Sequence, residues 1–434
     1  MQRVLASETP KFAGRSVSLF GWVDARRDHG KLVFIDLRDR SGLVQVVFGE
    51  EGGELHPEDV VHIVGTVQKR PENLINPHLE TGTVEVKAKE LKVLAPAAPL
   101  PFDLNQKDLQ LTLPTILDNR SLTLRHPKIQ AIFKIQETIA QCFRETMRSL
   151  SFREIFVPTI VASATEGGAE VFKLSYYDHE AYLAQSPQLY KQIMVSIFER
   201  AFTIAHAYRA EPSFTTRHLT EYVSLDCEMG FIDSWEDLMD VCEEFMHNLL
   251  DALTINAKKE LAMFEVELPK LSKKIPRIRL AEAQEMVKKD IGEPDLSPEG
   301  EKAICQWVRQ NKDSDFVFIT HYPASKRPFY TFRDPENKKL TLSFDLLFRG
   351  LECVTGGQRI NEYDELLLAI KNIGASPKQF EIYLQAFRFG MPPEGGFAIG
   401  LERVTAQLLG LPNVREASIF PRDPERVDIS FSKT

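Results

Sequence analysis

The residues with the clearest chemical potential form two segments near the middle of the chain. Tyr208-Arg209-Ala210-Glu211 is followed by residues 216–228, which hold an arginine, a histidine, a tyrosine and three acids. From Tyr222 onward apolar and polar residues alternate, which predicts a strand with Asp226 and Glu228 on one face. Arginines bind phosphates and an aromatic ring stacks on a base, so we predict a hairpin that binds a nucleoside triphosphate. A solvated charged hairpin is the alternative, and it would suit any single pair of these residues.

Two acids later in the chain have a spacing that suits a metal-bound phosphate. Asp345 and Glu352 lie within residues 343–352, where two adjacent strands would bring them together. Magnesium favours one or two carboxylates together with phosphate oxygens, so this pair is a candidate Mg²⁺ site. By spacing alone, a pair of solvent-facing acids is the commoner outcome, and that alternative stays open.

Two glycine-rich segments each end in an arginine. Gly356-Gly357-Gln358-Arg359 places its arginine just after two residues where the backbone can approach a ligand closely. Residues 395–403 predict a strand running into a helix, with Arg403 in the first turn, where the helix dipole favours anions. Neither segment is the phosphate loop with Gly-Lys-Ser or the Gly-x-Gly-x-x-Gly turn, so the folds that carry those loops are not indicated.

The first hundred residues read as short strands that would form a small barrel. The expected strands are 17–23, 31–38, 43–48, 60–69 and 83–94. Five strands in so short a length favour a closed barrel of the oligonucleotide-binding type. Phe34 and Gln45 are expected on the polar face of their strands. An exposed ring beside a long amide could stack on and hydrogen-bond to an unpaired base. The alternative is that Phe34 closes one end of the barrel core.

A proline-rich linker at 95–101 separates this barrel from a larger region with mixed helices and strands. Helical spacing of apolar residues predicts a long amphipathic helix at 129–150, and a strand is expected at 152–160. Residues 185–192, which include Lys191, precede an apolar helix. An isolated lysine is most often a plain surface residue.

Composition limits the classes of protein that fit. The chain has 434 residues, an apolar content of 43% and a net charge of −9, which predicts a soluble protein of two or three domains that does not coat nucleic acid through bulk charge. No apolar run reaches membrane-spanning length, and we expect no signal peptide. Five cysteines without a Cys-x-x-Cys pair indicate reduced thiols in a cytoplasmic protein.

Taken together, these segments resemble the class II aminoacyl-tRNA synthetases, and among them the aspartyl-tRNA synthetase family. Residues 129–160 are similar to motif 1, 208–228 to motif 2 and 395–403 to motif 3, while 21–30 and 34–48 resemble the anticodon-binding barrel. The length resembles the compact archaeal type, because 234–344 leaves no room for the insertion of ordinary bacterial enzymes.

This resemblance implies an α+β fold with three parts. An OB-fold anticodon-binding barrel would occupy residues 1–95, a hinge 96–125, and a class II catalytic domain 126–434. The catalytic domain would be an antiparallel β-sheet flanked by helices, with a small, mostly helical insertion at 234–310. Motif 1 would join two subunits in a homodimer.

The resemblance also implies roles for individual residues. Arg209 and Arg403 would be catalytic and grip the triphosphate, and Asp345 and Glu352 would carry Mg²⁺. The ATP-binding set would be Arg209, Glu211, Arg217, His218, Tyr222, Glu352, Gly400 and Arg403. The aspartate-binding set would be Glu166, Gln188, Lys191, Asp226, Glu228, Thr355 and Arg359, with Asp226 ordering Lys191. The anticodon-binding set would be Arg27, His29, Phe34, Gln45 and Pro77.

The implied activity is the ATP-dependent ligation of L-aspartate to tRNA through aspartyl-adenylate. His29 and Pro77 resemble the nondiscriminating subgroup, which aspartylates both tRNA-Asp and tRNA-Asn and leaves the second product to a separate amidotransferase. The alternatives are an asparaginyl-tRNA synthetase, a discriminating enzyme acting on tRNA-Asp alone, a non-catalytic RNA-binding paralogue, and a single-strand binding protein that uses only the barrel.

Overall fold

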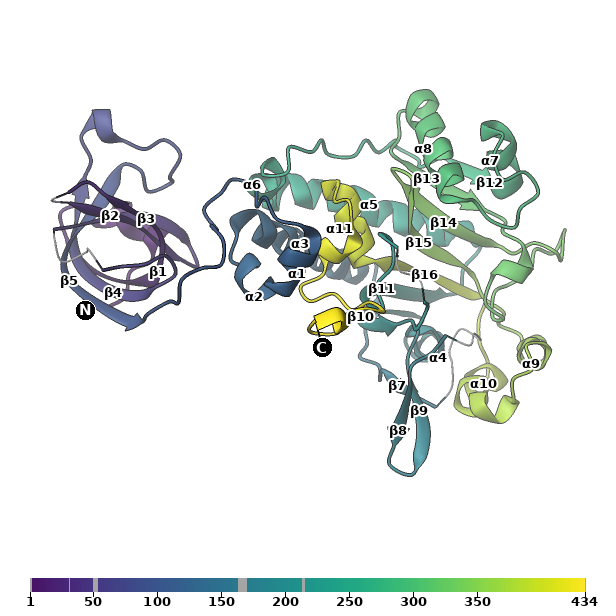
Figure 1. Ribbon diagram of the computed structural model, residues 1–434. Helices are drawn as coiled ribbons and strands as arrows, with labels where there is room; N and C mark the ends of the chain where they lie inside the picture. The colour runs from purple at the N-terminus through teal and green to yellow at the C-terminus, as the bar shows by residue number, and fades with distance from the viewer. Residues whose placement is uncertain (1, 31, 50–53, 163–169, 213–214, 434) are drawn as a thin grey trace. The chain divides into compact units, whose positions relative to one another are not determined.

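Two compact units make up the protein, Met1–Gln110 and Leu111–Thr434 (Figure 1). The computed structural model describes residues 2–30, 32–49, 54–162, 170–212 and 215–433. The two units have separate clusters of buried apolar side chains, so each is described by itself.

Five strands close into a barrel in the first unit, in the order β1-β2-β3-β5-β4. They are β1 (Ser16–Asp28), β2 (Val33–Asp39), β3 (Gly42–Phe48), β4 (Val60–Lys69) and β5 (Val84–Ala95), accompanied by the 3₁₀ helices η1 (Ala6–Phe12) and η3 (Glu72–Leu74). Alternation positions the core, because Ile35 and Leu37 of β2 are buried and Phe34 beside them is partly exposed. The predicted five-stranded barrel is confirmed.

An eight-stranded sheet organises the second unit, in the order β12-β13-β14-β15-β16-β11-β10-β6. The strands are β6 (Arg153–Glu154), β10 (Arg200–Tyr208), β11 (Glu221–Gly230), β12 (Arg277–Arg279), β13 (Phe316–Thr320), β14 (Ser343–Phe348), β15 (Leu351–Gln358) and β16 (Glu394–Gly400). Neighbours from β13 through β10 are antiparallel, and only the terminal pairs with β12 and β6 are parallel. This is the predicted antiparallel sheet.

Three helices cover one face of the sheet with apolar side chains. They are α3 (Pro127–Ser149), α5 (Glu236–Asn256) and α11 (Leu401–Leu409). The ring of Phe143 on α3 meets Phe202 of β10 and Phe245 of α5 edge to face, with centroids 5.8 and 5.4 Å away. The helix predicted at 129–150 is therefore present, and it begins at Pro127, a residue suited to the first helical position.

The opposite face of β11 meets α4 (Gln188–Phe198). Leu225 and Cys227 belong to the apolar core, whereas Asp226 and Glu228 both contact Lys191 of α4. The predicted alternation of this strand is thus confirmed, although its polar face is buried. The remaining helices are α1 (Leu113–Asp118), α2 (Arg120–Thr123), α6 (Lys258–Ala262), α7 (Leu280–Val287), α8 (Pro298–Lys312), α9 (Tyr363–Asn372) and α10 (Glu381–Arg388), and the 3₁₀ helices are η4 (Ala324–Lys326), η5 (Pro377–Phe380), η6 (Val414–Ala417) and η7 (Phe431–Lys433).

Three segments differ from the sequence expectation. Residues 152–160 do not form one strand: β6 joins the large sheet, and β7 (Ile160–Val161) joins a small sheet with β9 (His179–Leu183) and β8 (Lys173–Tyr176). The expected hinge at 96–125 contains α1 and α2, which belong to the second unit. The region 234–310 is mostly helical, but α5 packs in the central core and β12 extends the sheet. No helix among the described residues has the length and apolarity needed to span a bilayer.

Candidate active site

A cavity of about 540 Å³ lies over β11, β15 and β16. Five arginines line it: Arg209, Arg217, Arg327, Arg359 and Arg403. All of the residues predicted to bind ATP line this cavity, namely Arg209, Glu211, Arg217, His218, Tyr222, Glu352, Gly400 and Arg403. Of the residues predicted to bind aspartate, Gln188, Asp226, Thr355 and Arg359 line it as well. Residues that lie far apart in the sequence are thus brought to one polar cavity.

The segment between β10 and β11 carries the residues predicted to contact the nucleotide. Arg209 follows β10 directly, and its backbone N–H donates to the Thr220 carbonyl at 2.8 Å. Its guanidinium lies 5.7 Å from the centre of the Tyr222 ring and 3.8 Å from Glu211. The guanidinium thus approaches one face of the Tyr222 ring, the face that an adenine base would use for stacking.

Two of the residues predicted to bind ATP, Arg217 and His218, have protein partners. Arg217 forms an ion pair with Glu301 of α8, a residue that sequence reasoning did not single out. Burial raises the pKa of Glu301 to about 7, against the opposing charge of Arg217. Burial, and then the positive charge of Arg403, lower the pKa of His218, whose Nδ1 lies 2.6 Å from the Thr215 hydroxyl. In place of a phosphate, Arg217 therefore holds a carboxylate.

Arg403 connects the helix after β16 to the far wall of the cavity. It lies in the first turn of α11, where its guanidinium donates to the carbonyls of Arg217 and Glu352. Its distance to the Glu352 carboxylate is 3.7 Å. The guanidinium therefore spans the loop before β11 and the strand β15, the position expected of a group that grips a triphosphate.

The predicted metal pair sits on adjacent strands, β14 and β15, as expected. Glu352 lines the cavity, whereas Asp345 is buried beside it and accepts a hydrogen bond from Arg327 at 2.9 Å. Burial, and then the Asp345 carboxylate, raise the pKa of Glu352. The second oxygen of Asp345, Oδ1, is buried without a hydrogen-bond partner. A buried carboxylate oxygen without a hydrogen-bond partner, next to a second carboxylate, suits a magnesium ion whose other ligands are phosphate oxygens.

No group of three or more His, Cys, Asp or Glu side chains within the described ranges could hold a metal by itself. Any Mg²⁺ at this pair would consequently take its remaining ligands from the nucleotide or from water. Arg327 also lies 3.9 Å from the centre of the Tyr322 ring and donates to Thr355. Arg327 belongs to no recognisable motif, since a lone arginine before Pro328 has no distinctive spacing.

Lys191 is fully buried rather than a surface lysine. Its ammonium lies 2.9 Å from Asp226 and 3.0 Å from Glu228, and it does not line the cavity. Burial alone would lower the pKa of Lys191, but the two carboxylates raise it. Asp226 thus orders Lys191 as predicted. Direct contact between Lys191 and an amino-acid substrate would require one of these carboxylates to move.

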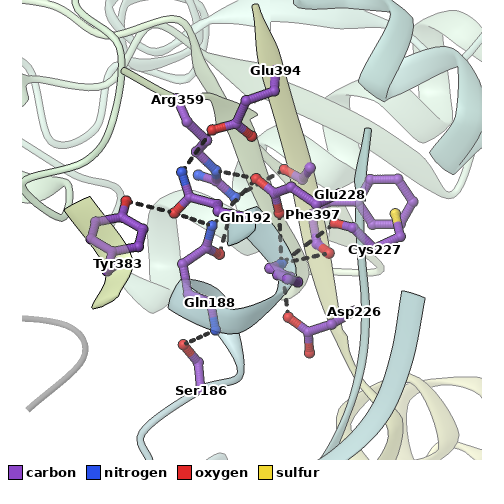
Figure 2. Close-up of polar contacts among 12 residues, drawn as sticks. Ser186, Gln188, Gln192, Asp226, Cys227, Glu228, Arg359, Tyr383, Glu394 and Phe397 are labelled. Carbon is purple, nitrogen blue, oxygen red and sulfur yellow. Dashed lines mark hydrogen bonds and ion pairs between the residues drawn. The ribbon is translucent and has the colours of Figure 1, made fainter. Parts of the chain in front are cut away.

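Arg359 converges on the same carboxylate from the other side. Its Nε donates to Glu228 at 2.8 Å, and its Nη2 donates to the Gly396 carbonyl at 3.1 Å (Figure 2). Burial would raise the pKa of Glu228, but Arg359 and Lys191 together lower it. Lys191 and Arg359 thus both contact the Glu228 carboxylate, which lies between them.

Gln188 and Gln192 of α4 complete this polar cluster. Gln188 donates to Glu228 at 3.3 Å and to Gln192 at 3.0 Å, and Gln192 donates to Glu394 at 2.7 Å (Figure 2). The Tyr383 hydroxyl of α10 donates to Gln192 at 3.0 Å. Sequence reasoning missed Gln192, Tyr383 and Glu394, because nothing in the local pattern shows which polar residues a distant strand will bury.

A glycine makes room for the central carboxylate. A Cβ at Gly396 would lie 2.3 Å from Glu228 Oε2 and 2.0 Å from the Cys227 carbonyl. No side chain fits there, so this glycine is required for close packing of β16 on β11. Glu166, which was predicted to close over the amino acid, lies outside the described residues.

Four of the five residues predicted to bind the anticodon share one part of the barrel. Arg27 pairs across strands with Phe34 and donates to Asp36 at 2.7 Å and to Gln45 at 3.5 Å. The His29 ring meets Phe34 edge to face, with centroids 5.4 Å apart. Phe34 is absent from the buried core of the barrel, so the ring does not close the barrel end.

The fifth residue, Pro77, is exposed in the segment between η3 and β5. The segment is held by the Asn76 N–H, which donates to the Gly82 carbonyl at 3.1 Å. Pro77 offers no side-chain donor or acceptor to a nucleic acid.

Comparisons with known proteins cover both units. A family model described as tRNA synthetases class II (D, K and N) matches residues 112–424, and one described as OB-fold nucleic acid binding domain matches residues 17–94. The chain is 45% identical over 429 residues to the aspartate–tRNA(Asp/Asn) ligase of Thermus thermophilus, covering 98% of this chain and 99% of the relative.

A second relative is the aspartate–tRNA(Asp) ligase of Pyrococcus horikoshii, which is 39% identical with coverage of 96% and 97%. Among solved structures, the asparaginyl-tRNA synthetase from Pyrococcus horikoshii complexed with asparaginyl-adenylate is similar with a TM-score of 0.89. Its sequence identity is 33%, and the match covers 98% of this chain and 99% of that one.

Proposed function

The chain belongs to the class II tRNA synthetases of the D, K and N group, and on that premise we propose that it ligates L-aspartate to tRNA with ATP. One observation carries the proposal: five arginines line a single cavity that continues to the buried Lys191–Glu228–Arg359 cluster. Desolvating several cations together is costly unless anions fill the space, and a triphosphate with an acidic amino acid does so.

The reaction needs positioning and charge stabilisation rather than a protein nucleophile. The α-carboxylate of aspartate attacks the α-phosphorus of ATP, which forms aspartyl-adenylate and releases pyrophosphate. The 3′-hydroxyl of the terminal tRNA adenosine then attacks the activated carbonyl, and AMP leaves. Arg209 and Arg403 lie where they can hold the triphosphate and stabilise the charge that develops on phosphorus.

Magnesium would enter this site with ATP. Glu352 and Asp345 would hold it through the carboxylate oxygens described above, and the ion would neutralise charge on the phosphates. Arg327, which is bonded to Asp345, fixes the orientation of that carboxylate before any nucleotide binds.

Arg359 is the group that would distinguish aspartate from asparagine. It lines the cavity and is 7% exposed. One cation at about 4 Å from a carboxylate contributes roughly 4 kcal/mol at an effective dielectric of ~20, which is about a thousandfold preference over the neutral amide. Asparaginyl enzymes share the fold, but aspartate ligases are the more similar relatives in sequence.

Amino acid-dependent pyrophosphate exchange tests the proposed activity. We expect aspartate to support exchange at concentrations where asparagine gives less than one part in a hundred of that rate. Arg359→Lys should lose most of the preference, because an ammonium cannot reproduce the forked geometry of the guanidinium. Equal exchange with both amino acids in the wild-type protein would refute the proposal.

We further propose that both tRNA-Asp and tRNA-Asn are aspartylated. The support is the exposed Pro77, which cannot select one base through a side-chain hydrogen bond, together with a Thermus thermophilus relative that carries the dual Asp/Asn name. Aspartyl-tRNA-Asn would then need a separate amidotransferase to become asparaginyl-tRNA. Charging purified tRNA-Asn transcript with aspartate tests this, and a rate below one hundredth of that for tRNA-Asp would exclude it.

An exposed apolar group supports the proposed homodimer. Phe156, which follows Ile155 just beyond the edge strand β6, is 90% exposed, and the other members are Ile160, Ile197, Phe198 and Phe231. Backbone bonds link the neighbours of these residues: Ile155 N–H to the Phe202 carbonyl and Gly230 N–H to the Glu199 carbonyl. Apolar side chains gathered at a sheet edge indicate a protein–protein interface.

Sedimentation velocity tests the dimer. We expect Phe156→Asp to shift the protein from dimer to monomer. Phe389→Asp, which changes another highly exposed ring just after α10, should leave the dimer intact. A wild-type monomer at micromolar concentration would contradict the proposal.

A further inference from the structure

Glu394 is a buried acid for which neither the predicted chemistry nor the reaction above has a use. It begins β16, is 0% exposed, and lies diagonally across from Glu228, because Glu228 pairs with Gly396 on the adjacent strand. Diagonal neighbours on one face of an antiparallel pair are within reach of long side chains. Two carboxyl groups are therefore buried against one another, in the same cluster as Arg359 (Figure 2).

The oxygens of these two acids are not equally satisfied. Glu394 Oε1 accepts from Gln192 at 2.7 Å, and Glu228 Oε1 accepts from Arg359 at 2.8 Å. Of the remaining oxygens, Glu228 Oε2 lies 3.0 Å from the Lys191 ammonium, whereas Glu394 Oε2 is buried without a hydrogen-bond partner. A proton on Glu394 that is donated to Glu228 turns two facing acceptors into a hydrogen bond and satisfies the Glu394 carboxyl.

Charge counting assigns that proton to Glu394. Glu228 has two cationic neighbours, Lys191 and Arg359, whereas no ion pair joins Glu394 to a cation in the described parts of the chain. Burial, and then the negative charge of Glu228, raise the pKa of Glu394 well above its usual value. The hydrogen bond between the two carboxyls acts in the same direction, which makes Glu394 the donor.

The proton also sets the charge that an incoming substrate meets. Lys191 and Arg359 balance Asp226 and Glu228, so the cluster is neutral only while Glu394 carries its proton. An ionised Glu394 would leave one negative charge directly behind Arg359, whose backbone N–H donates to the Glu394 carbonyl at 2.9 Å. That charge would oppose an anionic amino-acid side chain more than a neutral one.

We propose that Glu394 is a positioning residue that affects amino-acid specificity. Its protonated carboxyl donates a hydrogen bond to Glu228, and Glu228 in turn holds Arg359 in the orientation that binds the side-chain carboxylate of aspartate. Glu394 does not line the cavity, so it acts through Glu228 and Arg359 rather than by touching substrate. This role rests on the proposed function, because it takes aspartate as the substrate. The experiments are therefore chosen so that failure of the Glu394 proposal can be distinguished from failure of the proposed function.

Two variants of similar size distinguish a neutral donor from mere packing. Glu394→Gln keeps a donor for Glu228 and an acceptor for Gln192, so KM for aspartate should stay within about threefold of wild type. Glu394→Met removes both groups, so Glu228 loses this hydrogen bond and Gln192 loses its acceptor, and KM for aspartate should rise about tenfold or more. KM for ATP should be unchanged in both variants, because the nucleotide residues are not part of this cluster.

Infrared difference spectroscopy detects the proton directly and does not depend on activity. The difference spectrum between wild type and Glu394→Gln at neutral pH should show a protonated-carboxyl stretching band that is missing from the difference spectrum between wild type and Glu365→Gln, a change of an exposed acid on α9. Absence of that band, equal KM for aspartate in the Gln and Met variants, or a Gln variant as impaired as Met would overturn the role of Glu394. Failure of the wild-type protein to exchange pyrophosphate with aspartate would instead refute the proposed function, with the infrared result unaffected.

Discussion

Arg209 occupies the space over the Tyr222 ring, so the same guanidinium and ring are available to a phosphate and a base once a nucleotide enters. The side chain of Arg209 is 40% exposed, which leaves its donors accessible from the cavity.

Arg209→Ala should reduce the rate of adenylate formation about 100-fold to 1,000-fold, because removing one preorganised donor costs about 2.7–4 kcal/mol of transition-state stabilisation. Pyrophosphate exchange at saturating ATP and aspartate measures the loss. Arg15→Ala, a change in the barrel unit, serves as the matched control and should leave exchange unchanged. A loss of less than tenfold in Arg209→Ala would remove this residue from the catalytic set.

Glu402, which lines the cavity, should make the free energy of unfolding depend on pH. Burial raises its pKa to about 8, even though its carboxylate accepts from the Val223 N–H at 3.1 Å. The folded protein therefore binds a proton that the unfolded chain releases near pH 4.5. The contribution of protonated Glu402 to the free energy of unfolding is complete below pH 4.5 and is lost as the pH rises through about 8.

Replacing Glu402 by Gln should flatten the decline in melting temperature between pH 5 and about 8, because the amide cannot ionise. Melting curves of wild type and variant across this range provide the measurement. Glu365→Gln, an exposed change on α9, should follow the wild-type profile. Parallel profiles for Glu402→Gln and wild type would show that Glu402 is not the titrating group.

At the scale of elements, α8 gains a role that its sequence did not indicate. Its Glu301 forms an ion pair with Arg217, one of the arginines predicted to bind ATP, so we expect this carboxylate to compete with ATP for the guanidinium. The contact joins the 234–310 region to the motif 2 segment. The region had no predicted chemistry, because the pairing of Glu301 with Arg217 depends on the tertiary fold.

Glu301→Gln should lower KM for ATP about fivefold, since a partly exposed ion pair contributes up to about 1 kcal/mol and the variant no longer has to break it. Exchange assays across ATP concentrations give the value. Glu299→Gln changes an exposed acid in the same turn of α8 and should have no effect. A higher KM in Glu301→Gln would mean that Glu301 orients Arg217 for ATP instead of competing with it.

Elements with a clear period were predictable, and elements set by long-range contacts were not. Alternation placed the barrel strands and the two faces of β11, and helical spacing placed α3. The stretch 152–160 was apolar enough for one strand, but its two ends pair with different sheets. The residues predicted to bind ATP all line one cavity, and they could be grouped from the sequence because they lie in short motifs. Glu394, Gln192 and Arg327 were missed because their partners lie on other elements.

For the whole molecule, division into two units predicts that the two halves of the reaction can be impaired separately. Phe34→Ala removes the ring proposed to stack on an anticodon base, a contact worth about 1–3 kcal/mol. We expect KM for tRNA to rise about tenfold, while pyrophosphate exchange with aspartate stays at the wild-type rate. Leu74→Ala, an exposed apolar change on η3, is the matched control. Loss of exchange in Phe34→Ala would contradict a purely RNA-binding role for the barrel face.

The separate apolar cores have a consequence for how such an enzyme changes over generations. Buried side chains of the barrel and of the catalytic unit form different clusters, so a substitution near Pro77 need not disturb the packing around Arg359. The set of tRNAs that the enzyme accepts can thus change under selection while its amino-acid specificity stays the same. An enzyme built in this way can accept more than one tRNA without losing its amino-acid specificity, because the residues proposed for the two choices lie in different units.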